Sequence, residues 1–229
     1  AILAAVEATL ARGGALRGRR ALVTSGPTQE PIDPVRFIGN RSSGKQGHAI
    51  AEALAALGAE TVLVSGPTSL ADPVGVRALH VETAEQMLAA CRAALPVDVA
   101  VCAAAVADWR LAEPAAQKLK KGAKPPSLKL SETPDVLRAL GAAGNQRPRL
   151  LIGFAAETEQ LIERAKAKRA AKGCDWILAN DVSEGVFGLD DNSVTLVTAD
   201  KVEAWPKLTK REIGRRLAAR IAESLSAHG

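Results

Sequence analysis

The chain of 229 residues has a mass of 23.8 kDa, which favours one large α/β domain with a substantial core over two separate domains. Apolar residues make up 47% of it, but no run approaches the roughly 18 continuous apolar residues of a membrane-spanning helix, so we expect a soluble protein with no membrane partner. The net charge of +5 favours an anionic partner, and the few, scattered aromatic residues offer no stacking platform for nucleic acid, which leaves phosphorylated small molecules as the leading class.

The predicted elements alternate between strand and helix along the chain. Residues 1–12 have the pattern of a helix, and we expect residues 1–14 to be a connecting segment from an upstream domain, with the domain itself at 15–229. Strands are predicted at residues 20–24, 60–65, 77–82, 97–107, 150–154, 174–179 and 194–198. Helices are predicted at residues 47–57, 84–95, 134–140, 158–172 and 209–225. This alternation indicates an α/β fold with a doubly wound, Rossmann-like, largely parallel sheet and helices on both faces.

The polar residues that follow the predicted strands are candidates for a ligand site, because ligands of such sheets bind outside the carboxyl ends of the strands. They lie at residues 25–28, 65–66, 107–108, 155–157 and 180–181. Among them, Asp108 could hold ribose hydroxyls or a Mg²⁺ ion carried in with a nucleotide. Asn180 could bind an amide or hydroxyl group of a substrate, or it could be a plain strand-end turn.

The loop after the first strand, residues 24–47 (TSGPTQEPIDPVRFIGNRSSGKQG), is predicted to be the centre of the site. At about twenty residues it is far longer than the usual two to six between a strand and its helix. Its second half offers glycines, small hydroxyls and two cations just before a helix N-terminus, where backbone N–H groups and the helix dipole favour an anion. We therefore expect an anion-binding loop, with a solvated glycine-serine connection as the alternative.

Two familiar nucleotide-binding classes fit the sequence poorly. Residues 39–45 match the start of the phosphate-binding motif G-x-x-x-x-G-K-[ST], but Gln46 stands where that motif needs a Ser or Thr for Mg²⁺. A dinucleotide dehydrogenase would need G-x-G-x-x-G after the first strand and an acidic residue after the second, where the chain has Ser65 and Gly66. Neither a phosphate-loop NTPase nor a dehydrogenase is the favoured interpretation.

Lysines gather in two further stretches. Residues 118–129 (KLKKGAKPPSLK) contain five lysines, with a glycine and two prolines that prevent a regular element. Taken alone this stretch is typical of a solvated loop, but it begins ten residues after Asp108 and could close over bound phosphates as a mobile flap. Lys168 and Lys172 share one face of a predicted helix, for which a solvated face is the default interpretation.

The cysteines favour a reducing compartment and show no pattern typical of a zinc site. Cys91, Cys102 and Cys174 are far apart and form no C-x-x-C pair, so the sequence shows no zinc site or redox pair. A reducing cytoplasm fits this usage best. The small residues after Cys102 would let a flat ligand lie against the backbone, although ordinary alanine packing explains them equally well.

Taken together, these motifs resemble the phosphopantothenoylcysteine synthetase domain of the bacterial bifunctional coenzyme A biosynthesis flavoprotein. The resemblance runs from about Leu16 to Leu225 and rests on the 24–47 loop together with CAAAVADWR at 102–110, KLKK at 118–121, GFAAET at 153–158, ILANDVS at 177–183 and FGLDDNSV at 187–194. It implies a CTP-dependent ligase that uses Mg²⁺. In the implied reaction the carboxylate of 4'-phosphopantothenate attacks the α-phosphate of CTP and releases pyrophosphate; the amine of L-cysteine then displaces CMP from the acyl-cytidylate.

The resemblance also implies roles for individual residues. Asn40 matches the loop asparagine that hydrogen-bonds the substrate carboxylate and the acyl-cytidylate, and Lys118 matches the catalytic, nucleotide-contacting lysine of the flap. Arg36 and Asn180 match positions that bind phosphopantothenate. The positions that bind CTP match a larger set, namely Cys102, Ala103, Ala104, Asp108, Pro134, Asp135, Val136, Leu137, Phe154, Lys168 and Lys172. The neighbours of Asn40 depart from the family pattern, in which a bulkier residue or a His is common.

The resemblance further implies a homodimer and a flavin-binding decarboxylase domain before Ala1, so no flavin is expected within these residues. The alternative from another class is a non-catalytic nucleotide- or nucleic-acid-binding module that uses the lysine-rich stretch. Steep salt dependence of DNA binding without nucleotide turnover would favour that alternative.

Overall fold

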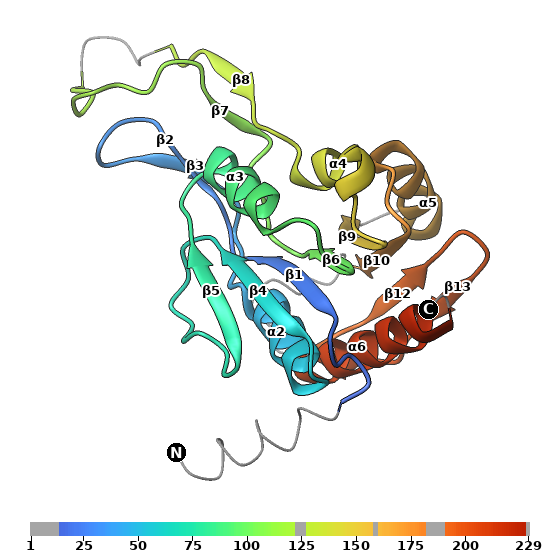
Figure 1. Ribbon diagram of the computed structural model, residues 1–229. Helices are drawn as coiled ribbons and strands as arrows, with labels where there is room; N and C mark the ends of the chain where they lie inside the picture. The colour runs from blue at the N-terminus through green and yellow to red at the C-terminus, as the bar shows by residue number, and fades with distance from the viewer. Residues whose placement is uncertain (1–13, 122–126, 158–159, 182–190, 228–229) are drawn as a thin grey trace.

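An eight-stranded sheet forms the centre of the computed structural model, which describes residues 14–121, 127–157, 160–181 and 191–227 (Figure 1). Its strands are β1 (Arg20–Ser25), β4 (Glu60–Ser65), β5 (Val76–His80), β6 (Val99–Cys102), β9 (Leu150–Glu157), β10 (Trp176–Asp181), β12 (Val194–Val197) and β13 (Val202–Ala204). The order across the sheet is β13-β12-β10-β9-β6-β1-β4-β5. The strands from β10 to β5 pair in parallel, whereas β12 and β13 pair antiparallel at one edge. The predicted α/β fold with a largely parallel sheet is therefore confirmed.

Helices cover both faces of the sheet. Those in the described ranges are α2 (Lys45–Ala56), α3 (Ala84–Ala94), α4 (Val136–Gly141), α5 (Leu161–Lys172) and α6 (Lys210–Ala227). On one face α2 and α6 bury Ile50 and Leu217 against the strands, and on the other α3, α4 and α5 bury Met87, Leu140 and Ala165 (Figure 1). Within the described part of the chain, no helix is long and apolar enough to cross a membrane.

Helix ends follow the capping signals in the sequence, with one correction. The Thr83 side chain accepts from Gln86 N at the start of α3 and completes a capping box, as the position of this threonine predicts. Pro134 is predicted at the first helical position of the next helix, and this is wrong. Asp135 is the N-cap and accepts from Arg138 N at 3.0 Å, so α4 begins at Val136, two residues later than predicted, and Pro134 lies in the connection.

The apolar run predicted as a strand at 97–107 stops being a strand after Cys102. Its continuation lies beside the loop that follows β1, since Ala103 N donates to Thr24 O at 3.2 Å and Ala105 N donates to Gly26 O at 2.9 Å. A single parallel bridge joins Pro27 to Ala105. Residues 103–107 therefore form an irregular ledge at the carboxyl end of the sheet.

Two short strand pairs extend away from the sheet and form a structure that we call the arm, residues 29–39, 109–121 and 127–132 (Figure 1). One pair is β2 (Gln29–Pro31) with β3 (Phe37–Gly39), and the other is β7 (Trp109–Leu111) with β8 (Leu130–Glu132). The first pair lies inside the stretch predicted as one long loop. A period-two pattern cannot identify strands of three residues, so the sequence predicts none of the four. A third pair, β11 (Asp191–Asn192) with β14 (Leu208–Thr209), lies elsewhere in the structure.

Other boundaries move by a few residues. The helix predicted at 47–57 begins at Lys45, and β9 continues to Glu157 beyond its predicted end at 154. The predicted helix at 1–12 and the lysine-rich residues 122–126 lie outside the described residues.

Candidate active site

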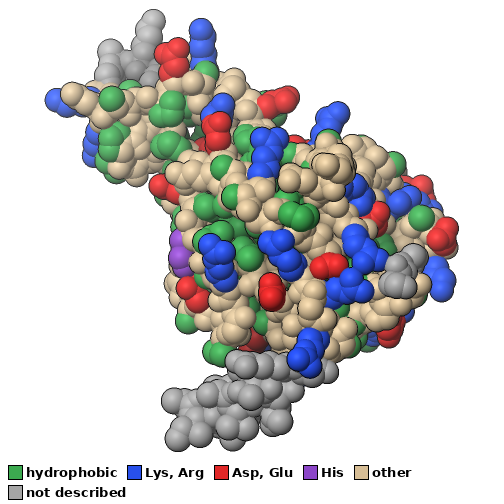
Figure 2. All heavy atoms as spheres, viewed as in Figure 1, with side chains coloured by type: hydrophobic (Ala, Val, Ile, Leu, Met, Phe, Trp, Pro, Cys, Tyr) green, Lys and Arg blue, Asp and Glu red, His purple; other side chains and the backbone are tan. Residues whose placement is uncertain are grey.

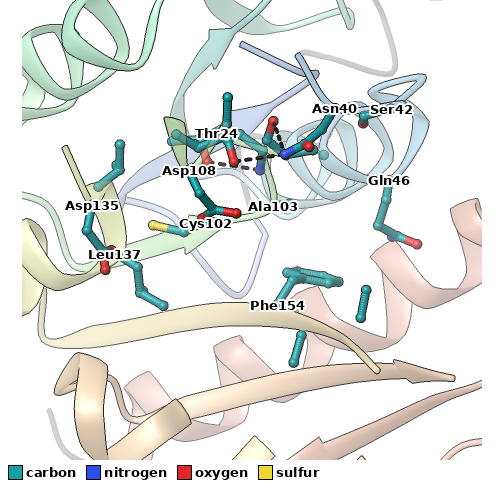
Figure 3. A pocket seen from close by; sticks show the side chains of 18 of the residues that line it. Thr24, Asn40, Ser42, Gln46, Cys102, Ala103, Asp108, Asp135, Leu137 and Phe154 are labelled. Carbon is teal, nitrogen blue, oxygen red and sulfur yellow. Dashed lines mark hydrogen bonds between the residues drawn. The ribbon is translucent and has the colours of Figure 1, made fainter. Parts of the chain in front are cut away.

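A pocket of about 1280 Å³ opens at the carboxyl ends of β1, β6, β9 and β10, where the fold predicts a ligand (Figure 3). The 40–47 loop with the start of α2, the 102–109 ledge, the segment that starts α4, and the two lysines of α5 line its walls. Thirteen of the fifteen residues predicted for the site line this pocket: Asn40, Cys102, Ala103, Ala104, Asp108, Pro134, Asp135, Val136, Leu137, Phe154, Lys168, Lys172 and Asn180.

The N-terminus of α2 faces the pocket because three polar groups fix its first turn. Gly44 is the N-cap and adopts a left-handed conformation with φ of 73°, which a side chain would strain. Its carbonyl accepts from Ser25 Oγ at 2.8 Å and contacts His48 Nδ1 at 3.1 Å. Gly47 is also required, since a Cβ there would lie 2.4 Å from Ser25 Oγ. The first N–H groups of α2 thus point toward the pocket and favour an anionic group.

His48 is buried, with 7% of its surface exposed, and its Nδ1 lies 3.0 Å from Ser25 Oγ. Burial lowers the pKa of His48, because removing the ring from water disfavours the imidazolium form. The neutral ring therefore helps to hold the Gly44 carbonyl at physiological pH. His48 belongs to the support of the anion-binding turn, and the sequence pattern does not predict that role.

Asn40 joins the 40–47 loop to the ledge. Its Nδ2 donates to Val106 O at 2.9 Å and to Ala105 O at 3.4 Å (Figure 3). The second bond is long and therefore weak, so a ligand oxygen can replace it at small cost. Thr24 Oγ1 accepts from Ala104 N at 3.2 Å on the inner side of the same ledge. Asn40 thus stands at the rim with its amide beside the backbone that forms the pocket floor.

Two lysines of α5 line the side of the pocket opposite the 40–47 loop. Lys172 Nζ donates to Asp135 Oδ2, and Lys168 on the same helix face also lines the pocket. Burial on its own would raise the pKa of Asp135, but the hydrogen bonds from Lys172 and Arg138 N, with the charges of both lysines, lower it. The default interpretation of these lysines as a solvated face is therefore wrong, because the structure turns this face of α5 toward a cavity.

The inner part of the pocket is apolar. Cys102, Leu137 and Phe154 project from β6, α4 and β9 around one region of it (Figure 3). Burial raises the pKa of the Cys102 thiol well above its ordinary value, so this side chain is a neutral packing group and not a thiolate. The apolar surface that these three side chains form can bind a flat ring.

The carboxylates of the pocket do not form a complete metal site. Among the described lining residues the acidic side chains are Asp108, Glu132 and Asp135, and Asp135 is engaged by Lys172. No group of three His, Cys, Asp or Glu side chains with metal-binding geometry exists in the described residues. Asp108, the carboxylate predicted as a ligand for a Mg²⁺ ion carried in with a nucleotide, is exposed and lines the pocket, where it could supply one carboxylate to such an ion.

Several lining residues are absent from the sequence-based prediction. They include Thr24, Trp109, Glu132, Thr133, Arg138 and Lys210. Thr24 ends the first strand and so carries the same signal as the predicted residues, whereas Lys210 reaches the site because Gln46 Nε2 donates to its carbonyl at 3.2 Å and brings α6 beside α2. Asn180 lies in the pocket with a buried Oδ1 that has no partner among the described residues, which a ligand donor would satisfy.

Two predicted residues, Arg36 and Lys118, do not line the pocket and lie instead on the arm. Arg36 donates from Nε to Asp33 Oδ2 at 3.0 Å, and this guanidinium holds the pKa of the Asp33 carboxyl well below its usual range. Figure 2 shows hydrophobic side chains on the surface of the arm at the upper left of the view. The large apolar side chains that the arm exposes are Val35, Phe37, Trp109, Leu128 and Leu130. Several large apolar side chains exposed on one small structure are typical of an interaction surface.

Comparison with known proteins identifies the family. A model described as the DNA/pantothenate metabolism flavoprotein C-terminal domain matches residues 16–225. The chain belongs to this family. A curated member, the coenzyme A biosynthesis bifunctional protein CoaBC of Mycobacterium tuberculosis, is 47% identical over 224 residues, which cover 92% of this chain and 52% of that protein. The chain thus spans about half the length of the curated relatives it matches.

Solved structures agree with the family assignment. The crystal structure of the C-terminal domain of a CoaBC protein matches with a TM-score of 0.79 and 41% identity, over 93% of this chain and 99% of that one. A Cab2 mutant in complex with phosphopantothenate-cysteine matches with a TM-score of 0.72 and 17% identity, over 99% of this chain and 92% of that one. At that identity the second structure supports the fold alone.

Proposed function

We propose that this domain is a phosphopantothenate–cysteine ligase of coenzyme A biosynthesis. In the first step a carboxylate oxygen of 4'-phosphopantothenate attacks the α-phosphorus of CTP, and the bond to pyrophosphate breaks. In the second step the amine of L-cysteine attacks the acyl carbon of the acyl-cytidylate, CMP leaves with the bonding electrons, and the amine loses a proton. A carboxylate does not react with amines at neutral pH, so the site must supply a good leaving group and hold the anions together.

The proposal rests on one observation in a chain that belongs to this family. A single pocket lies between a helix N-terminus that favours an anion and the two lysines of α5. The α2 N-terminus on one side and Lys168 and Lys172 on the other suit a triphosphate, and the apolar surface around Phe154 suits a pyrimidine ring. Mg²⁺ bound to the phosphates would neutralise charge on the leaving pyrophosphate, with Asp108 as its protein ligand.

Asn40 and Asn180 have roles that match their geometry. The weak bond from Asn40 Nδ2 to Ala105 O is the one that the substrate carboxylate would replace, which places this carboxylate above the ledge. The unpartnered Oδ1 of Asn180 would accept a donor of the pantothenate part of the substrate. Lys118 would follow the negative charge that develops on the phosphates.

We propose that the domain works as a homodimer in which the arm of one copy reaches the pocket of the other. Arg36 and Lys118 lie on the arm and away from the pocket of their own chain, and the arm exposes the apolar side chains that a second copy would cover. This arrangement gives both cations access to a bound substrate. The phosphate of phosphopantothenate would pair with Arg36 and the CTP phosphates with Lys118.

The remaining elements of the proposal concern the whole protein. Residues 1–14 would connect the ligase domain, 15–229, to an upstream flavin-binding decarboxylase domain, which agrees with the half-length match to bifunctional relatives. The three cysteines are free thiols, which suits a cytoplasmic enzyme.

The test is pyrophosphate release from CTP by the purified chain with 4'-phosphopantothenate and Mg²⁺, with and without L-cysteine, and with ATP in parallel. The proposal predicts release that requires phosphopantothenate, prefers CTP and becomes multiple-turnover when cysteine is added. Absence of release from folded protein, together with salt-sensitive binding to DNA, would instead favour a non-catalytic binding module.

A further inference from the structure

Arg36 and Lys118 are the two predicted site residues that do not line the pocket, and one buried carboxylate on the arm, that of Asp33, bonds to the backbone beside both of them. Asp33 is 4% exposed and lies at the turn between β2 and β3. Its Oδ1 accepts from the backbone N–H groups of Val35 and Arg36, both at 2.9 Å, which closes the turn D-P-V-R around the carboxylate. The carboxylate thus fixes the backbone from which the Arg36 side chain extends.

The second oxygen of Asp33 holds the side chain of Arg36. Both Nε and Nη2 of the guanidinium donate to Oδ2, at 3.0 Å and 2.5 Å. A charge-assisted contact with two donors fixes the plane of the guanidinium as well as its position. The Arg36 side chain is 47% exposed, so its orientation is set by Asp33 while its outer edge faces away from the protein.

The same pair also binds the lysine-bearing segment of the arm that follows β7. Asp33 Oδ2 accepts from Leu119 N at 3.1 Å, and Arg36 Nη2 donates to Leu119 O at 2.8 Å. Both backbone polar groups of Leu119, the residue after Lys118, are therefore bound by one ion pair. A further bond from Ala115 N to Ile32 O at 2.9 Å aligns the two segments a few residues earlier.

We propose that Asp33 is a positioning residue of the ligase reaction, which presents Arg36 and Lys118 together as one rigid cationic unit. This inference rests on the proposed function, since it assigns the two cations to the phosphates of the substrates. Lysine and arginine side chains lose much conformational freedom when they bind, and a common anchor reduces that loss. Asp33 touches neither substrate and acts through the two residues that it holds.

The structure provides a matched control for the loss of such a carboxylate. Asp175 also accepts from an arginine and a backbone amide: Arg147 Nη2 donates to its Oδ1 at 3.0 Å, and Leu151 N donates to its Oδ2 at 2.7 Å. This second pair lies at the amino end of β9, on the side of the sheet away from the pocket. Asp33→Asn and Asp175→Asn therefore remove similar interactions at two places.

The experiment compares initial rates of CTP-dependent pyrophosphate release for the wild-type protein and both variants, with melting curves and dimer content as parallel measurements. Absence of activity in the wild type would count against the proposed function and is separate from the effect of Asp33. With an active wild type, we expect Asp33→Asn to lower kcat about 10- to 100-fold and to raise the KM for phosphopantothenate more than the KM for CTP. Asp175→Asn should lower the melting temperature and leave both kinetic constants within about twofold.

A double-mutant cycle separates positioning from folding. If Asp33 acts through Lys118, Asp33→Asn should have much less effect on kcat in the Lys118→Ala background than in the wild type. Asp33→Glu should restore part of the activity, because it keeps the charge. Additive effects in the cycle, or an Asp33→Asn variant with wild-type kinetics and only a lower melting temperature, would overturn the proposal.

Discussion

The pocket and the arm differ in how many of their side chains find partners within the same chain. The pocket is built from the carboxyl ends of parallel strands. Several of its polar groups meet protein partners, as Asn40 meets Val106 O and Asp135 meets Lys172, whereas Asn180 Oδ1 has none among the described residues. The arm is built from strands of three residues and leaves Phe37 and Leu130 half-exposed. Among the described residues of the arm, the deeply buried charged side chains are Asp33, which pairs with Arg36, and Glu30, which accepts from Ala84 N. This difference supports our proposal that the pocket binds the substrates and that the arm docks on a second copy.

A division of this kind has a physical benefit for a reaction between two anions. A permanent cluster of cations inside the pocket would destabilise the free enzyme by mutual repulsion. In the proposed arrangement, the cations on the arm are held apart from those of the pocket, and Asp33 offsets the charge of Arg36 until the phosphates bind. The following changes test this contrast between the two regions.

The largest effect is expected from Lys118→Ala. Removing one charge aimed at the reacting phosphates should lower kcat by about 100-fold or more, with little change in stability because Lys118 is exposed. Lys129→Ala is the control, since Lys129 is also exposed on the arm and its backbone carbonyl alone is bonded, to Ala112 N at 3.0 Å. Equal losses in both variants, measured by steady-state kinetics, would reduce the arm to a diffuse electrostatic patch.

A charge on the apolar face of the arm should separate the dimer. Phe37 is 53% exposed, and burying such a ring contributes about 1.5–3 kcal/mol, so Phe37→Asp should weaken association at least 10-fold. Val74→Asp serves as the control because Val74 is 69% exposed but lies outside the arm. Sedimentation velocity at several concentrations measures the change. A dimer that tolerates Phe37→Asp as well as Val74→Asp would move the interface elsewhere.

Asn40→Asp changes the pocket rim without changing its size. The new carboxylate would face the carbonyl oxygens of Val106 and Ala105 as well as the carboxylate of the substrate. We expect the KM for phosphopantothenate to rise about 10-fold, corresponding to roughly 1.4 kcal/mol of repulsion, with a smaller change for CTP. Asn145→Asp, an exposed change outside the pocket, controls for the added charge. Unchanged kinetics would remove Asn40 from the mechanism.

The smallest expected effect concerns the pH dependence of stability through His48. Its pKa is lower in the folded protein than the ordinary value of 6.5, so the unfolded chain binds a proton first as the pH falls. Stability should therefore decrease as the pH falls through about 6.5 and level off below the folded pKa. His48→Asn should lack this component, as measured by urea unfolding across that range. A variant with the same pH slope as the wild type would show that His48 is not responsible.

The sequence predicts the sheet and the pocket well because both depend on long, strongly patterned elements. The 97–107 run identifies the central strand, and the carboxyl ends of β1, β6, β9 and β10 carry small or polar residues that line the pocket, such as Thr24 or Ala155. The resemblance to a family then selects particular residues from that edge. Lys172 is an example of a residue whose partner, Asp135, only the fold supplies, since the two are 37 positions apart.

The arm was beyond prediction for a physical reason. Its strands are too short for periodicity, and their pairing depends on Asp33 and Leu119, which are 86 positions apart. The local signal for the turn was present, because an Asp followed by Pro and then by an Arg three positions later favours a closed turn. The position of Lys118 away from its own pocket depends on this long-range contact and has no local signal.

Mixing two impaired homodimers, assayed with phosphopantothenate well below its KM so that both defects lower the rate, tests the central claim most directly. The Asn40→Asp variant has a damaged pocket and an intact arm, and the Lys118→Ala variant has the reverse. If each arm serves the pocket of the partner, a mixed dimer contains one undamaged site, and subunit exchange should restore roughly a quarter of wild-type activity. If each arm serves its own pocket, both sites of a mixed dimer are damaged. Mixed dimers that form, as shown by a tag on one variant, and yet show no gain in activity over the two separate variants would contradict the account.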